Sequence, residues 1–435
     1  MKKHLLIIIL LLSFHFEIKA QSFDPLLSAR LQQSIDSMRQ VLNVKGISAG
    51  VYHPEMGSWQ GVSGISHAGA PIGTDMQFGI ASNTKLFTGV LMLKLAENNL
   101  ISLEDSLHEY LPSYNNIDSN ITIRQLLNHT SGLDDVSSVP GYPDSMLNNP
   151  NRVFTADEMM GWAGQPSFSA GNGWEYCNTN YLLAAMIAEA ASGQSYAQLL
   201  RDSILNPLGL DSTFLDVYET VNGSIAHPWQ NNFDNFNIPR TSVNSAAWSA
   251  GGMYSNSGEM LQWFRALLNG QVLNSNSMTE LTTFVGSGNY SMGIAENTVN
   301  NRTVWFHGGS IWGGYNSTMM YDTASGIIIC VLINQFPSQA FLVAGKLLSD
   351  MTEMPLNTTV LEEDRFHVFP NPVGDILNVD IQNHHIKSIK IFSTSGELLL
   401  ESSQNQIPIS GLTSGLYLIQ LETEKGNYWD KFVKK

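Results

Sequence analysis

The stretch FGIASNTKLF, residues 78–87, places a serine one helical turn before a lysine. Ser82 and Lys85 are three residues apart, so on a helix their side chains share a face. Serine is a weak nucleophile unless a base takes its proton, and a buried lysine can serve as that base because desolvation lowers its pKa. The alternative is a helix cap at Ser82 with Lys85 pointing to water. The spacing by itself leaves both interpretations open.

Composition narrows the classes of protein to consider. The chain has 435 residues, of which 43% are hydrophobic, so it is long and apolar enough to bury a large core. Its formal net charge of −16 argues against nucleic acid or an anionic membrane surface as a partner, because both need basic patches.

The first 20 residues have the pattern of a secretory signal peptide. Lys2 and Lys3 precede an apolar run from Leu5 to Phe16, and Ala20 offers a small residue for cleavage. A membrane anchor is the alternative, but the run is shorter than the roughly 20 residues that span a bilayer. We expect a signal peptide at 1–20 and no transmembrane segment after its removal.

Residues 21–352 read as one α+β domain, an antiparallel sheet flanked by helices. The stretches 84–98 and 180–192 are expected to be amphipathic helices. Late in the domain, TVWFHGG, GYNSTMMYD and GIIICVLIN are three strand-length segments separated by turns, typical of consecutive antiparallel strands. The third is apolar throughout, which predicts a central strand covered on both faces.

Beyond a linker at 353–366, residues 367–435 change in character. DILNVDI alternates apolar and polar residues, and further short strands are divided by Ser-Gly turns, which predicts a small all-β sandwich. VFPNPVGDILNV, IKIFSTSGELL and the final ISGLTSGLYLIQLETEKGNYWDKFVKK resemble the C-terminal sorting domain of the type IX secretion system. The resemblance implies a secreted or cell-surface protein that has the secretion machinery as a partner. A carbohydrate-binding or spacer β-sandwich is the alternative.

A second resemblance covers nearly all of residues 30–335. FGIASNTKLF and the helix after it, ITIRQLLNHTSGL, GNGWEYCNTNYLL and HGGSIWGGYNSTMMYD occur in that order. They resemble the serine beta-lactamase-like family, which includes class C beta-lactamases, D-alanyl-D-alanine carboxypeptidases and esterases. The resemblance implies the beta-lactamase/transpeptidase-like fold with a helical subdomain. It also implies that Ser82 is the nucleophile and Lys85 its base.

The family's second motif is Tyr-x-Asn, and the sequence offers three copies. Tyr114 lies in a polar loop and Tyr254 follows a Gly-Gly turn, whereas Tyr176 precedes a long helix as in the family. The resemblance therefore assigns Tyr176 as a phenolate or proton relay. It assigns Asn178 as the amide that holds the substrate or the lysine.

The third motif begins with Lys or His and has Gly two positions later. Of two candidates, His67 and His307, only His307 lies on a late strand. By resemblance, His307, Gly308, Gly309 and Ser310 form the strand edge that binds substrate, and the N–H of Ser310 completes an oxyanion hole. Class C beta-lactamases carry Lys-Thr-Gly here. A weakly charged histidine followed by Gly-Gly argues against efficient recognition of beta-lactams or terminal carboxylates.

The sequence thus predicts a secreted serine hydrolase that forms an acyl-enzyme with D-amino-acid peptides, amides or esters and needs no cofactor or metal. A catalytically silent relative that binds peptidoglycan fragments or beta-lactams is the alternative, and a surface adhesin is a third hypothesis. Cys177 and Cys330 are the only cysteines, too few for a four-cysteine zinc site. We expect free buried thiols, and a single disulfide between the two is the alternative.

Four further side chains are weighed individually. His129 in LLNHTSGL is expected to brace a turn. For His227 and Trp229, two alternatives stay open: they line the substrate groove, or they lie outside it. Trp312 either shapes the acyl pocket or packs in the core.

Overall fold

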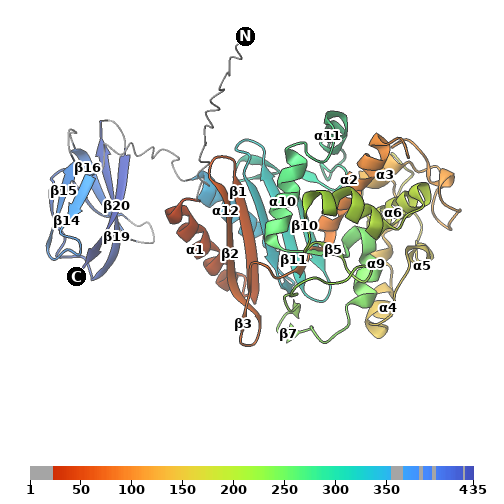
Figure 1. The fold of residues 1–435 in the computed structure, drawn as a ribbon, viewed down its shortest axis with the longest axis horizontal. Helices are drawn as coiled ribbons and strands as arrows, with labels where there is room; N and C mark the ends of the chain where they lie inside the picture. The colour runs from red at the N-terminus through yellow and green to blue at the C-terminus, as the bar shows by residue number, and fades with distance from the viewer. Residues whose placement is uncertain (1–22, 354–365, 382–385, 394–397, 425–426) are drawn as a thin grey trace, which may run out of the picture. The chain divides into compact units, whose positions relative to one another are not determined.

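The structure is a computed structural model that describes residues 23–353, 366–381, 386–393, 398–424 and 427–435. The chain divides into two compact units, one up to Glu353 and one from Met354 onward, and each is described by itself (Figure 1). The predicted signal peptide lies outside the described residues, and so does most of the predicted linker.

The first unit is built on a seven-stranded antiparallel sheet with the strand order β3-β2-β1-β12-β11-β10-β9. The strands are β1 (Gly46–His53), β2 (Gly57–His67), β3 (Ala70–Pro71), β9 (Ala295–Val299), β10 (Arg302–Ile311), β11 (Tyr315–Asp322) and β12 (Ile328–Ile333). The predicted late meander is confirmed, since β10, β11 and β12 are consecutive neighbours. All six residues of β12 are buried, and the strand lies between β1 and β11, as its apolar sequence predicts.

Helices cover both faces of this sheet (Figure 1). On one face, α1 (Pro25–Val41) and α12 (Ala340–Thr352) pack against each other and against the strands. On the other, α10 (Ser257–Leu268) packs on β1 and β12. A strand covered on both sides has no solvent-facing positions, which explains why β12 lacks alternating polar residues.

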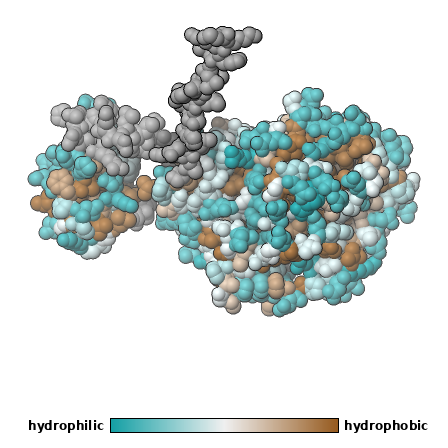
Figure 2. Space-filling view, viewed as in Figure 1, coloured by the Kyte–Doolittle hydropathy of each residue, from teal (hydrophilic) through white to brown (hydrophobic). Residues whose placement is uncertain are grey.

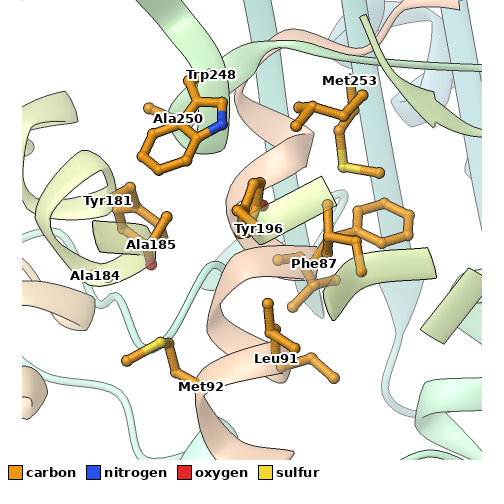
Figure 3. Close-up of a cluster of buried hydrophobic side chains, with 14 of the residues drawn as sticks. Phe87, Leu91, Met92, Tyr181, Ala184, Ala185, Tyr196, Trp248, Ala250 and Met253 are labelled. Atoms are coloured by element: carbon orange, nitrogen blue, oxygen red, sulfur yellow. The ribbon is translucent and has the colours of Figure 1, made fainter. Parts of the chain in front are cut away.

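The helical part of the unit surrounds α2 (Thr84–Glu97), which packs against α6 (Asn178–Ser192), α7 (Tyr196–Leu200) and α9 (Thr241–Gly251). Figure 3 shows Phe87, Leu91 and Met92 of α2 packed among side chains of those helices. Eleven of the 14 residues of α2 are buried, because neighbouring elements enclose this helix on nearly every side. The prediction of a helix is confirmed, but the prediction that the helix is amphipathic is wrong. The start of α2 is therefore held rigidly.

Shorter elements complete the first unit. The short helices are α3 (Ile123–Leu127), α4 (Tyr142–Asn148), α5 (Ala156–Met160), α8 (Asn206–Leu208) and α11 (Ser275–Leu281). The short strands are β4 (Phe78–Gly79), β5 (Phe214–Leu215), β6 (Trp229–Gln230), β7 (Phe233–Asp234), β8 (Met253–Ser255) and β13 (Gln335–Phe336).

The second unit is all-β, as predicted. One sheet has the order β14-β15-β18 and the other β17-β16-β19-β20, and one apolar core lies between them. The strands are β14 (Phe366–Phe369), β15 (Ile376–Ile381), β16 (Ile386–Phe392), β17 (Leu398–Ser402), β18 (Gln406–Pro408), β19 (Gly415–Thr423) and β20 (Asn427–Lys434).

The surface of the first unit is mostly hydrophilic on the face that Figure 2 shows, and hydrophobic side chains occur there in small separate patches. Among the described residues, no helix has both the length and the apolar character needed to cross a bilayer.

Candidate active site

Ser82 lies in a single 3-10 turn, Ala81–Asn83, that leads directly into α2, so the predicted helix start is confirmed. Ala81 has φ +49°, a left-handed conformation that is uncommon for residues other than glycine and allows a sharp turn from β4 into the helix. The turn is fixed to β11, because Asn83 Nδ2 donates to Ser317 Oγ at 2.7 Å and Ser317 Oγ donates to the Ile80 carbonyl at 2.6 Å.

Lys85 is completely buried, and its Nζ makes three hydrogen bonds. It donates to Ser82 Oγ at 3.1 Å, to Asn178 Oδ1 at 2.7 Å and to the Ala250 carbonyl at 2.6 Å. Burial lowers the pKa of Lys85 to about 7, although the charge of Asp135 opposes this change. A large fraction of Lys85 is therefore neutral at neutral pH and can accept a proton from the serine beside it.

The Ala250 carbonyl reaches Lys85 because α9 is broken near its end. Trp248 has φ 33° and ψ −117°, which lie outside the helical region. The carbonyls that follow point toward α2: Ser249 accepts Thr88 Oγ1 at 2.7 Å, and Ala250 accepts Lys85 (Figure 3 shows Trp248 and Ala250). This strained segment supplies one of the three partners of the lysine.

Asn178, the first residue of α6, connects the lysine to an acidic side chain. Its Oδ1 accepts from Lys85, while its Nδ2 donates to Asp135 Oδ2 at 2.9 Å and to Ser137 Oγ at 3.0 Å. These two acceptors fix the amide orientation, so the amide oxygen faces the lysine. Asn178 therefore holds Lys85, one of the two roles predicted for it.

Tyr176 is partly buried beside the same pair. Lys85 Nζ lies 5.0 Å from the centre of its ring, and its hydroxyl lies close enough to Ser82 for that side chain to lower its pKa. Burial raises the pKa of Tyr176 well above its ordinary value, and the neighbouring Ser82 hydroxyl only partly opposes this. The phenol is protonated at neutral pH, which favours the proton relay over the phenolate among the two predicted roles.

His307 lies on β10, and both of its ring nitrogens are engaged. Nδ1 lies 2.6 Å from the Gly308 carbonyl and must donate to it, so Nε2 accepts from the Tyr290 hydroxyl at 2.9 Å. Burial and the charge of Lys85 lower the pKa of His307 to about 3. The imidazole is therefore neutral and has no free N–H for a ligand.

The outer half of β10 forms an edge beside Ser82. Residues 308–311 pair with β11 on one side. On the other side, β9 pairs only with residues 302–306 of β10, so from Gly308 to Ile311 that side has no strand partner among the described residues. Gly309 packs against the nucleophile turn: a Cβ there would come within 2.3 Å of the Ile80 carbonyl. Ser310 Oγ accepts from Asn316 Nδ2 at 2.6 Å, which anchors the edge to β11.

The copies set aside in the sequence have other partners. Tyr114 donates to Asp157 at 2.8 Å, and the Tyr254 hydroxyl accepts from Asn244 Nδ2 at 3.1 Å. His67 stacks on His227 with 3.9 Å between ring centres.

A cavity of about 160 Å³ opens beside Ser82, and none of its lining residues carries a charged side chain. Trp312 lines the cavity, in agreement with the first of its two alternatives, a place beside the acyl pocket. His227 and Trp229 are not among the lining residues. The lining residues are Ala81, Ser82, Val136, Ser137, Tyr142, Met146, Asn178, Leu182, Val243, Ala246, Ala247, Ala250, Gly251, Ser310, Ile311 and Trp312. The cavity suits a neutral, largely apolar group attached to the reacting carbonyl.

The structure adds residues that the sequence did not single out. Asp135, Ala250 and Tyr290 each contact a predicted site residue, and no spacing rule pointed to them. Cys177 and Cys330 are both buried and free, as expected. Among the described residues, no group of three or more His, Cys, Asp or Glu side chains is placed to hold a metal ion.

Comparison with known proteins identifies both units. The beta-lactamase family model matches residues 32–349, and the model of the secretion system C-terminal sorting domain matches residues 367–435. Protein flp of Staphylococcus aureus (strain MW2) is 28% identical over 320 residues, 69% of this chain and 59% of that protein. Penicillin-binding protein 4* of Bacillus subtilis (strain 168) is 37% identical over 144 residues, 33% of this chain and 31% of that protein. The matches thus span less than two thirds of the length of either relative.

Solved structures show the same fold. The D-stereospecific amidohydrolase from Streptomyces sp. superposes with a TM-score of 0.66 and 26% identity, over 75% of this chain and 99% of that one. The D-amino acid amidase from Ochrobactrum anthropi SV3, complexed with L-phenylalanine, superposes with a TM-score of 0.66 and 25% identity, over 75% of this chain and 97% of that one. The chain belongs to the beta-lactamase family of serine hydrolases and carries a type IX secretion sorting domain, which indicates export to the cell surface or the medium.

Proposed function

We propose that the first unit hydrolyses D-amino-acid amides, peptides or esters through an acyl-enzyme on Ser82. The observation that carries this proposal is the buried amine of Lys85, 3.1 Å from Ser82 Oγ and with its pKa lowered to about 7. A general base works best when its pKa lies near the working pH.

Proton transfer follows from the hydrogen bonds. Neutral Lys85 takes the Ser82 proton, and the freed Oγ forms a bond to the substrate carbonyl carbon. Tyr176, protonated and next to Ser82, passes a proton to the departing amine or alcohol as its bond to that carbon breaks, and Lys85 replaces the proton. A water molecule then attacks the acyl-enzyme in the same way, giving the acid and returning the proton to Ser82.

The edge of β10 supplies the remaining groups. The N–H of Ser82, at the start of a helix, and that of Ser310 are proposed to hold the oxyanion that forms during attack. An extended substrate can lie along the unpaired edge of β10 and make main-chain hydrogen bonds with it. Gly308 has no side chain to obstruct that path.

Substrates without a free carboxylate fit this site best. The cavity has no charged lining residue, and His307 is neutral with both nitrogens engaged, so neither offers a cation to a terminal carboxylate. This favours amides and esters with apolar side chains over beta-lactams and D-alanyl-D-alanine peptides. The D configuration rests on the names of the Streptomyces amidohydrolase and the Ochrobactrum amidase.

Turnover of a small substrate panel tests the proposal. D- and L-phenylalanine amide, a short-chain p-nitrophenyl ester, a D-alanyl-D-alanine peptide and nitrocefin would be compared on the full-length protein. We expect the D-amide and the ester to be hydrolysed fastest, by the wild type and by Ser58→Ala, an exposed serine on β2, but not by Ser82→Ala. Labelling of Ser82 by a fluorophosphonate probe, without turnover of any substrate in the panel, would instead support the alternative of a catalytically silent relative that only binds its ligands.

A further inference from the structure

Behind Tyr176 lies a buried histidine that does not line the cavity. His129 follows α3 and is completely inaccessible to solvent. Its ring centre lies 4.5 Å from those of both Tyr176 and Tyr290, and Tyr181 is close by at 5.3 Å. The ring therefore forms part of the wall against which Tyr176 packs.

His129 also holds the backbone on both sides of Tyr176. Its carbonyl accepts the N–H of Glu175 at 3.1 Å, and its Nδ1 accepts the N–H of Cys177 at 3.2 Å. The same Nδ1 accepts Asn180 Nδ2 at 3.0 Å. One residue thus holds the N–H groups of the residues before and after Tyr176 and a side chain on the first turn of α6.

These contacts determine the state of the imidazole. A backbone N–H and an amide NH₂ can only donate, so Nδ1 is unprotonated and the ring carries its proton on Nε2. Nε2 has no hydrogen-bond partner among the described residues and is enclosed by aromatic rings. The working part of His129 is therefore the acceptor at Nδ1, together with the turn that presents it.

We propose that His129 is a positioning residue that sets the place of the Tyr176 hydroxyl and the Asn178 amide relative to Ser82. This inference rests on the proposed function, because it assigns His129 to the alignment of the relay rather than to the fold alone. Misplacement of a reacting group by about 1 Å can cost on the order of a hundredfold in rate. Because His129 makes no contact with the cavity, its loss should lower kcat and leave KM nearly unchanged.

The backbone at His129 makes a matched pair of variants available. Its φ is +64°, a left-handed conformation that glycine and asparagine adopt readily and alanine does not. His129→Asn keeps both the backbone and an acceptor oxygen near the position of Nδ1. His129→Gly keeps the backbone but removes the acceptor, so comparison of the two isolates the hydrogen bonds to Cys177 and Asn180.

The experiment measures kcat and KM for a p-nitrophenyl ester with the full-length wild type and both variants. Saturating fluorophosphonate labelling counts the folded, reactive Ser82 sites, and rates are expressed per site. We expect His129→Asn to retain kcat within about threefold of wild type and His129→Gly to lose at least about tenfold, with KM changed by less than about threefold in each.

Three results would count against the inference. If both variants match wild type per reactive site, His129 only stabilises the fold and the inference is overturned, while the proposed function stands. If both variants lose activity equally, the acceptor at Nδ1 is not what positions Tyr176. If the wild type neither turns over the ester nor takes up the label, the proposed function fails first and the inference fails with it.

Discussion

Replacing Asp135 with asparagine tests how the site sets the pKa of its base. The Asp135 carboxylate accepts the Asn178 amide at 2.9 Å, and an asparagine oxygen can accept the same hydrogen bond. The substitution therefore removes a negative charge and keeps the contact that orients Asn178. It gives up the hydrogen bonds that the other carboxylate oxygen accepts from the N–H and hydroxyl of Ser137. The charge of Asp135 raises the pKa of Lys85 against the larger effect of burial, so its removal lowers that pKa below about 7.

The size of the effect follows from the geometry. Lys85 Nζ and Asp135 Oδ2 are bridged by the Asn178 side chain through hydrogen bonds of 2.7 and 2.9 Å. A bridge of this length places the two charges roughly 7 Å apart. At an effective dielectric constant of about 20, their interaction is about 2 kcal/mol, and the partial exposure of Asp135 reduces it. We expect the midpoint of the kinetic titration to fall by about one pH unit.

The assay is the pH dependence of kcat/KM for a p-nitrophenyl ester. Because the base must be neutral, activity rises with pH through the pKa of Lys85, and in Asp135→Asn this rise should occur at lower pH. Asp134→Asn is the matched control: it removes the same charge from the neighbouring residue, whose carboxylate accepts the Gly164 N–H instead. A midpoint that stays in place or moves upward in Asp135→Asn would refute this account of the lysine.

Three further substitutions test the packing, the cavity and the buried amine. Gly309→Ala should lower stability by about 1–3 kcal/mol and lower activity as well, because its Cβ would come within 2.3 Å of the Ile80 carbonyl. Gly308→Ala is the control, since the nearest atom to a Cβ at Gly308 is 4.0 Å away. Thermal melts and ester kinetics would compare the two variants. Ala247→Leu narrows the cavity and should reduce kcat/KM at least about tenfold for a phenylalanine amide but less for an acetyl ester, and equal losses would contradict the placement of the side chain. Lys85→Met should melt at a higher temperature than wild type near pH 7, and the difference in melting temperature should shrink as pH rises toward 10.5. Between these pH values the unfolded wild type binds a proton that the folded protein lacks, so the wild type gains stability as pH rises. A difference independent of pH would contradict the lowered pKa.

The local part of the site could be predicted from the sequence. Ser82 and Lys85 share one turn, and Tyr176 and Asn178 share one short segment, so each pair is visible as a motif. The structure brings the two pairs together through the hydrogen bond from Lys85 to Asn178.

Other parts of the site depend on tertiary structure and left no local signal. The Ala250 carbonyl points at Lys85 only because the backbone breaks at Trp248. Tyr290 is separated from His307 by 17 positions in the sequence, yet its hydroxyl binds Nε2 of this residue, which the resemblance had placed on the substrate-binding edge. Contacts of this kind depend on how separate segments pack, and no spacing in the chain encodes them.

The same distinction holds for the fold. The apolar run of β12 predicts a strand buried on both faces, because an alternating pattern would be needed for one exposed face. The residues of α2 suggested an amphipathic helix, but the helix is buried nearly all round. The number of neighbouring helices, which the local pattern does not contain, made that difference.

Direct detection of the acyl-enzyme tests the central claim. The full-length wild type would be mixed with an activated D-amino-acid ester, quenched within the first turnovers, digested and mapped by mass spectrometry. The account predicts the acyl group on Ser82 in the wild type and no acylated peptide in Ser82→Ala. An acyl group on another residue, or hydrolysis by Ser82→Ala at the wild-type rate, would contradict it.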